Sequence, residues 1–357
     1  MKPYFHAWNL VFEGMPKPFW AVLNTYQNLK LAWDKASESR LFEIGVRSIY
    51  LKKLRELRKT LDPSQEFSKI IHQDIKVLVC RDDDEYPPQL KNLNNHLPPA
   101  ILYVKGKIPS SSKAFVSIVG TRQMTGYGES VTKQIVRTLQ GYNLVITSGM
   151  AYGIDSTAHK AALENKMQTV AVLGFGLNRI PHYLRQFAYK ISRNGALVSE
   201  YPPDLEAQKW HFPLRNRIIS GLSKATIVVE AGERSGASIT AQYALDQGRE
   251  VFAVPGNIYN EKSKGTNRLI KTSSATLLKE PEDILETLSI PRHKDNLILH
   301  LSQNQKIVAK ALIQKPLSLN ELERFTNLIP QSLNVALTEL ELNGLIQKNR
   351  GGRYFII

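Results

Sequence analysis

The feature that most constrains the fold is an alternation of short apolar runs with amphipathic stretches between residues 71 and 287. The apolar runs have the length of strands, and the stretches between them place apolar residues at helical spacing. Nearly continuous apolar strands are typical of a parallel sheet that is buried on both faces. The sequence therefore predicts an α/β fold with an extended Rossmann-like parallel-sheet core. Strands are expected at residues 115–119, 144–147, 170–173, 196–199, 226–229 and 251–254, and helices at 130–139, 156–163 and 239–247.

The segments on either side of this core have different patterns. The first seventy residues predict an N-terminal helical domain, in which the leucines at 51, 54 and 57 share one face and the charged residues between them face solvent. A polar stretch with a proline then predicts a linker. Three amphipathic segments and a glycine-containing hairpin pattern predict a C-terminal winged-helix domain. The expected parts are residues 1–70, 71–288, 289–302 and 303–357.

The charge balance favours an anionic partner. Lysine and arginine number 47 against 32 acidic residues, which gives a formal net charge of +15. A basic protein gains affinity for nucleic acid because counterions are released from the phosphate backbone. A basic surface without such a partner is the alternative that charge alone leaves open.

The single cysteine, Cys80, excludes an internal disulfide, and the sequence has no CxxC or Cys/His pattern for zinc. It also has neither a secretory leader pattern nor a run of 18 apolar residues. We therefore expect a cytoplasmic protein that does not enter a membrane and that needs no metal or other cofactor.

Glycine-rich loops follow several of the predicted strands. Because the carboxyl ends of parallel strands meet at one edge of a sheet, we expect these loops to form one rim. In GTRQMTGYG, Gly120 and Thr121 shape a turn, and Arg122 presents a guanidinium suited to phosphate. In SGMAYGID, Ser148 and Gly149 allow the backbone to line a groove. Each loop by itself is also compatible with an ordinary tight turn.

The most informative stretch, HFPLRNRIISGLSK, directly precedes the fifth predicted strand. We interpret it as a basic loop. Phe212 offers a stacking surface, and Arg215 and Arg217 offer contacts to phosphates, which is the combination that single-stranded nucleic acid requires. Asn216 and Lys224 add polar groups to the same stretch. A solvated basic loop without a ligand is the alternative.

The loop EAGERSGAS follows the fifth strand and leads into a predicted helix. Ser235, Gly236 and Ser238 stand where the N-terminus of that helix would hold an anion. Glu230 and Glu233 disfavour a simple phosphate cradle unless their carboxylates point away from it.

Together these motifs resemble those of the DNA-processing protein A family, also called DprA or Smf. SIVGTRxxTGYG, ITSGMAYGIDSTAHKAAL, AVLGFG, FPLRNRIISGLSKATIVVEAGERSGASITAQYALDQGREVFAVPG and GTNRLI occur in the family's order between residues 75 and 287. The C-terminal part resembles the winged-helix module of many members, whereas residues 14–18 are a poor copy of the family's helix–hairpin–helix glycine pattern. The resemblance implies a non-enzymatic homodimer of natural transformation that binds and protects incoming single-stranded DNA and loads the RecA recombinase onto it.

The resemblance also assigns DNA contacts to residues of these motifs. They are Gly120, Thr121, Arg122, Ser148, Gly149, Phe212, Arg215, Asn216, Arg217, Lys224, Ser235, Gly236 and Ser238.

Two other functions are weighed against this one. The predicted sheet is similar to that of nucleoside-monophosphate phosphoribohydrolases, whose PGGxGTxxE signature corresponds here to EAGERSGASIT without the final glutamate. An enzyme or sensor for a nucleotide derivative is thus the second hypothesis, and it depends on Glu230 and Glu233. A transcription regulator is the third, although its recognition helix at 330–343 has no lysine or arginine for phosphates. The sequence has no Walker or GxSxG motif, and His159 is expected to be a packing residue.

Overall fold

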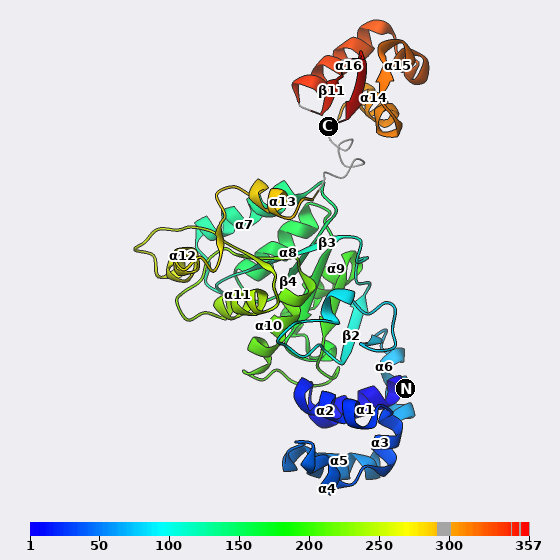
Figure 1. The fold of residues 1–357 in the computed structure, drawn as a ribbon, viewed down its shortest axis with the longest axis vertical. Coiled ribbons are helices and arrows are strands. Elements are labelled where there is room, and N and C mark those ends of the chain that lie inside the picture. The colour runs from blue at the N-terminus through cyan, green and yellow to red at the C-terminus, as the bar shows by residue number, and fades with distance from the viewer. Residues whose placement is uncertain (291–300, 344, 350, 357) are drawn as a thin grey trace. The chain divides into compact units, whose positions relative to one another are not determined.

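The computed structural model describes residues 1–290, 301–343, 345–349 and 351–356 (Figure 1). It divides into two compact units, the first made of Met1–Gln140 and Leu144–Leu288 and the second of Gly141–Asn143 and Ser289–Ile357. The boundary predicted near residue 70 does not separate two units, because the N-terminal helices belong to the first one. Most of the predicted linker lies outside the described residues.

A mostly parallel sheet of nine strands forms the centre of the first unit, in the order β1-β2-β6-β5-β4-β3-β7-β8-β9. The pairs from β6 to β9 in this order are parallel, whereas β2 pairs antiparallel with both β1 and β6. The six predicted strands and their parallel arrangement are confirmed, and β1, β2 and β9 are additional to them. The strands are β1 (Lys76–Val79), β2 (Ile101–Gly106), β3 (Ala114–Val119), β4 (Leu144–Ser148), β5 (Thr169–Leu173), β6 (Ala196–Ser199), β7 (Ala225–Val228), β8 (Glu250–Ala253) and β9 (Thr276–Leu277).

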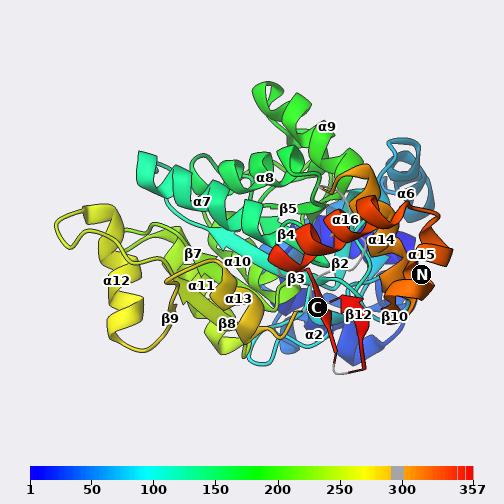
Figure 2. The same ribbon diagram turned by 90° about the horizontal axis from the view of Figure 1, so that it is seen from above.

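The direction of the chain across the sheet decides which face each helix covers. From β3 to β6 the chain moves one way, and right-handed crossovers place α7, α8 and α9 on one face. From β7 to β9 it moves the other way, and α11 packs with α10 on the opposite face (Figure 2). The helices that follow the strands of this sheet are α7 (Gly126–Leu139), α8 (Ile154–Glu164), α9 (Arg185–Asn194), α10 (His211–Leu222), α11 (Gly236–Asp246), α12 (Lys264–Lys271) and α13 (Glu282–Thr287).

One element differs in kind from its prediction. The stretch expected to be a basic loop is the helix α10, and its residues from Arg215 to Leu222 are all buried. Pro213 is compatible with this helix because it stands in the first turn, where its missing N–H has no intrahelical partner. Short 3-10 helices also occur in the loops, among them η3 (His182–Leu184), directly before α9.

The N-terminal helices have an aromatic core. The indole of Trp8 stacks on Phe12 with 5.4 Å between ring centroids, and Trp33 packs against it edge-on at 5.7 Å. Because large aromatic side chains bury much apolar area, they suffice to order such short helices. The prediction of helices in this segment is confirmed: α1 (Lys2–Phe12), α2 (Pro16–Tyr26), α3 (Leu29–Lys35), α4 (Glu38–Glu43), α5 (Ser48–Thr60) and α6 (Pro63–His72).

The core of these helices continues into the sheet. Trp8 and Phe5 belong to one hydrophobic cluster with Tyr103 of β2 and Ile191 of α9. The Asn9 amide donates to the carbonyl of Glu200 at 2.9 Å, which fastens α1 to the end of β6. The N-terminal helices therefore act as a cover for one side of the sheet.

The second unit has the winged-helix arrangement that the sequence predicts. Its helices are α14 (Gln303–Gln314), α15 (Leu319–Thr326) and α16 (Pro330–Leu342), and its small antiparallel sheet has the order β10 (Leu317–Ser318), β12 (Arg353–Ile356), β11 (Ile346–Lys348). Leu322, Leu333 and Leu340 form the centre of its own hydrophobic core. Capping boxes at Ser302 and Ser318 fix the starts of α14 and α15. Within the described parts of both units, no helix is long and apolar enough to span a bilayer.

Candidate functional site

The candidate site is a cavity of about 520 Å³ at the point where the strand order reverses. β3 has β4 on one side and β7 on the other. The loop after β3 and the loop after β7 lead to helices on opposite faces of the sheet, which leaves a crevice between these two loops. The lining residues come from these loops and from α10 and α11. They are Val119, Gly120, Thr121, Arg122, Ala151, Asp155, Lys209, Phe212, Pro213, Arg215, Asn216, Ile219, Ser235, Gly236, Ala237 and Thr240.

Arg122 and Phe212 meet at this cavity. The guanidinium carbon of Arg122 lies 5.6 Å from the centroid of the Phe212 ring, within cation–π distance. The Arg122 side chain is exposed, and among the described residues it has no carboxylate within ion-pair distance, nor does Lys209. Two free cations and an aromatic ring can thus receive a phosphate and a base at the same place.

The loops after β3, β4 and β7 are locked together through their backbones. The Thr121 amide donates to the Glu230 carbonyl at 2.8 Å, and the Ile154 amide donates to the Thr121 carbonyl at 3.2 Å. Gly153, at a φ of +77°, leaves no room for a side chain, since a Cβ there would lie 2.2 Å from the Thr121 carbonyl oxygen. The position of Arg122 is therefore set by main-chain contacts on both sides of its turn.

A buried arginine and a buried aspartate line the deeper part of the cavity. Arg215 donates to the carbonyl of Gly149 at 3.0 Å and to that of Val172, while the Asp155 carboxylate accepts from the Gly149 amide at 3.0 Å. Burial lowers the pKa of Arg215 to about 10 and raises that of Asp155, a rise that the positive charge of Arg215 opposes. Arg215 remains protonated near neutral pH and contributes a fixed positive charge behind Arg122.

The two glutamates that complicated the prediction point away from the cavity. The Glu230 carboxylate accepts from the amide and the hydroxyl of Thr125, at 2.9 and 2.5 Å, and so fixes the start of α7. Glu233 forms an ion pair with Arg268 at 3.8 Å. Neither glutamate lines the cavity, so neither carboxylate repels an anion bound there. The two carboxylates on which the hypothesis of an enzyme or sensor for a nucleotide derivative depends therefore do not lie in this cavity.

Ser235 and Gly236 lie where they are expected, at the start of α11. This helix begins at Gly236, earlier than predicted, and the Ser235 hydroxyl caps it by accepting from the Ser238 amide. Asn216 of α10 donates to the Gly236 carbonyl at 3.1 Å, which holds the two helices together at the cavity wall. Ser238 itself does not line the cavity.

Ser148 and Gly149 do not line the cavity, contrary to the prediction, and instead support it from behind. Ser148 is fully buried, and its hydroxyl donates to the carbonyl of Ile118 at 2.6 Å. A Cβ at Gly149 would lie 2.6 Å from an Arg215 nitrogen and 2.8 Å from an Asp155 oxygen, so the glycine makes room for these two side chains.

Arg217 and Lys224 also lie away from the cavity, and the burial of Arg217 contradicts its predicted contact with DNA. Arg217 is buried and forms an ion pair with Glu200 at 2.8 Å. Burial raises the pKa of Glu200, whereas the Arg217 charge acts against this rise. Lys224 immediately precedes β7, so it lies at the opposite edge of the sheet from the loops that form the cavity.

Sequence reasoning missed Lys209 and assigned no ligand role to Asp155. Lys209 stands three residues before Phe212, so a wider reading of the basic stretch would have included it. The expected packing role of His159 is confirmed: the residue is fully buried, its Nδ1 lies 2.6 Å from the Thr169 hydroxyl, and burial lowers its pKa to about 3.

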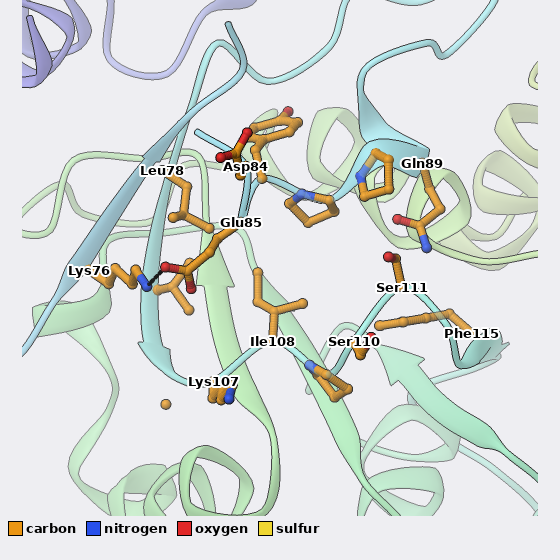
Figure 3. Close-up of a pocket in the computed structure, with 16 residues that line it drawn as sticks. Lys76, Leu78, Asp84, Glu85, Gln89, Lys107, Ile108, Ser110, Ser111 and Phe115 are labelled. Atoms are coloured by element: carbon orange, nitrogen blue, oxygen red, sulfur yellow. Dashed lines mark hydrogen bonds and ion pairs between the residues drawn. The ribbon is translucent and has the colours of Figure 1, made fainter. Parts of the chain in front are cut away.

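A second cavity, of about 280 Å³, has a different character (Figure 3). It lies beside the amino ends of β1 and β3, lined among others by Leu78, Ile108 and Phe115. Lys76 in its wall is already paired with Glu85. The cavity at the strand reversal is the better anion site, because its unpaired Arg122 and Lys209 lie beside an aromatic ring, whereas the carboxylates of Asp84 and Glu85 lie in the wall of the second cavity. Among the described residues, no cluster of histidine, cysteine and acidic side chains is arranged to hold a metal ion.

Comparisons with known proteins give matches to both parts of the chain. A family model described as DNA recombination-mediator protein A matches residues 77–289, and one described as the DprA winged helix domain matches residues 292–352. Protein Smf of Escherichia coli is 42% identical over 67% of this chain and 67% of its own length.

Two solved structures share the fold of this chain. That of DNA processing protein A from Streptococcus pneumoniae has a TM-score of 0.67 and 31% identity over 78% of this chain and 97% of that one. The Helicobacter pylori protein, in a structure described as giving insights into its single-stranded DNA binding mode, has a TM-score of 0.51 and 28% identity over 60% of this chain and 95% of that one. The chain belongs to the DNA recombination-mediator protein A, or DprA/Smf, family.

Proposed function

We propose that this protein binds single-stranded DNA in the cavity at the strand reversal. The observation that carries the proposal is the unpaired Arg122 guanidinium over the Phe212 ring, at the mouth of a cavity whose walls are main-chain turns. A phosphate would contact Arg122 and Lys209, and a base would stack on Phe212. Backbone contacts and stacking accept every base, so we expect little sequence preference.

We further propose that the protein is a recombination mediator of natural transformation, which protects incoming DNA and loads RecA onto it. The family description and the DNA-binding relative support this proposal. It includes action in the cytoplasm as a homodimer, in which two cavities would hold one strand and raise its effective concentration at each. It also includes that the protein does not turn over its ligand, so mononucleotides incubated with it are expected to be recovered unchanged.

Replacing Arg122 tests the proposed site. We expect Arg122→Ala to weaken binding of oligothymidine by about tenfold and to reduce the slope of log affinity against log salt by about 0.7, the contribution of one phosphate contact in a single strand. The measurement is a titration by fluorescence anisotropy at several salt concentrations, with a duplex of the same length alongside.

Arg137→Ala is the matched control, because Arg137 is an exposed arginine on α7 away from the cavity lining. Its affinity and salt slope should equal those of the parent protein. Equal binding by the Arg122 and Arg137 variants would contradict the proposed site, and competition by mononucleotides at stoichiometric amounts would favour the nucleotide-derivative hypothesis instead.

A further inference from the structure

Two exposed tyrosines stack on each other close to the cavity. Tyr152 and Tyr183 have ring centroids 6.1 Å apart and ring planes only 11° from parallel. They are 59% and 64% exposed. The outer faces of these rings expose apolar surface to water, and keeping the two rings parallel reduces the conformational entropy of both side chains. A flat surface of this kind suits a ligand that itself has a flat face.

The stacked pair continues the cavity along the rim. Tyr152 follows β4, between Ala151 and Asp155, which both line the cavity. Tyr183 lies in η3, in the connection that follows β5. Because β4 and β5 are adjacent parallel strands, their loops are neighbours at the same edge of the sheet.

Beyond the pair, the outer face of α9 is basic. Its inner face is buried through Ala188 and Ile191, and its exposed residues follow each other at helical spacing: Arg185, Gln186, Tyr189, Lys190 and Arg193. Among the described residues, none of these three cations has an ion-pair partner.

The sequence around this face contains no acidic residue at all between Glu164 and Glu200. The strands β5 and β6 within this stretch are buried, and its exposed part, which includes η3 and the outer face of α9, presents cations and aromatic rings without carboxylates of its own. Such a surface is complementary to a polyanion with flat bases. The helix stands at the outer edge of the layer formed by α7, α8 and α9 (Figure 2).

We propose that Tyr152, Tyr183 and the outer face of α9 form a second contact tract for single-stranded DNA. A strand that leaves the cavity would place a base on the Tyr152–Tyr183 stack and its phosphates along Arg185 and Arg193. This inference rests on the proposed function, since it concerns the path of the same strand outside the cavity. It predicts that affinity grows with oligonucleotide length until the tract is filled.

The stacking part of the tract is tested with the double variant Tyr152→Leu, Tyr183→Leu. We expect it to bind oligothymidine of about 20 nucleotides about tenfold more weakly than the parent, and one of about 6 nucleotides, enough for the cavity, with unchanged affinity. Tyr152→Phe, Tyr183→Phe keeps both rings and should restore binding of the long strand. Phe42→Leu, which removes an exposed ring on α4, is the control and should bind like the parent.

The charged part is tested with Arg185→Ala, Arg193→Ala. Loss of two phosphate contacts should reduce the salt slope for the long oligonucleotide by about 1.4 and leave that for the short one unchanged. Lys52→Ala, Lys59→Ala, which removes two exposed charges from α5, should leave both slopes as they are. A cross-link from a halogenated uracil in the long strand should map to Tyr152 or Tyr183.

The outcomes separate this inference from the proposed function. Parental affinity of the tyrosine and arginine variants for the long strand would overturn the tract while leaving the cavity proposal in place. If instead the parent binds neither oligonucleotide, or if Arg122→Ala binds both like the parent, the proposed function fails first. An equal loss for both lengths would also overturn the tract, because it would indicate damage to the cavity.

Discussion

At the residue scale, the cations in and around the cavity have two different roles. Arg217 is neutralised by Glu200 in the core, and Arg215 is held by backbone carbonyls at the cavity wall. Arg122 and Lys209 are exposed and unpaired at the cavity. The sequence predicts that cations gather here but cannot predict which of them face solvent. Arg217 is buried because the fold places Glu200, at the end of β6, beside it.

Replacing Arg217 distinguishes a structural from a DNA-binding role. We expect Arg217→Met to reduce the free energy of unfolding by about 3–5 kcal/mol, because it leaves the Glu200 carboxylate buried without a partner. The double variant Arg217→Met, Glu200→Leu should be far less affected, since no buried charge remains. Urea unfolding followed by circular dichroism measures both. A single variant with parental stability and weak DNA binding would show instead that Arg217 contacts DNA.

At the element scale, the apolar runs predict the six parallel strands well, because strands buried on both faces need continuous apolar residues. Two elements, β2 and α10, are harder to predict from the sequence. β2 is antiparallel and begins two residues after Pro99, so it does not take part in the strand–helix alternation. α10 is buried on nearly all sides, and its buried arginines hide the apolar stripe by which an amphipathic helix is recognised.

The interlocking of two loops gives a prediction at this scale. Gly153→Ala should reduce the free energy of unfolding by about 2–4 kcal/mol, because its φ is positive and its Cβ would collide with the Thr121 carbonyl. It should also weaken DNA binding, since Thr121 precedes Arg122. Gly126→Ala is the control: nothing lies within 4 Å of a Cβ there, and alanine in the first turn of α7 should be neutral or slightly stabilising. Thermal unfolding of the two variants that gives equal midpoints would contradict the interlock.

At the scale of the whole molecule, the cavity and the winged helix belong to separate compact units with separate hydrophobic cores. The residues that line the cavity all belong to the first unit. The spacing of apolar residues predicts both units, whereas the extent of the first one, which includes the N-terminal helices, follows from aromatic packing that the sequence pattern does not reveal.

Removing the winged helix tests whether the first unit carries the binding site by itself. We expect residues 1–288 to bind oligothymidine within about twofold of the full chain when both are titrated at the same salt concentration, because no phosphate contact of the cavity is lost. A loss of tenfold or more would place part of the affinity in the winged helix.

The attachment of α1 to the sheet has a consequence for any shortened form of this protein. Asn9 binds the main chain of Glu200, and the side chain of Glu200 holds Arg217 in the helix that carries Phe212. A shortened protein without the N-terminal helices would expose Tyr103 to water. It would also lose the hydrogen bond from Asn9 to Glu200, the residue whose side chain holds Arg217 of α10 in place. A functional protein without the first helices would need other apolar side chains to cover β2.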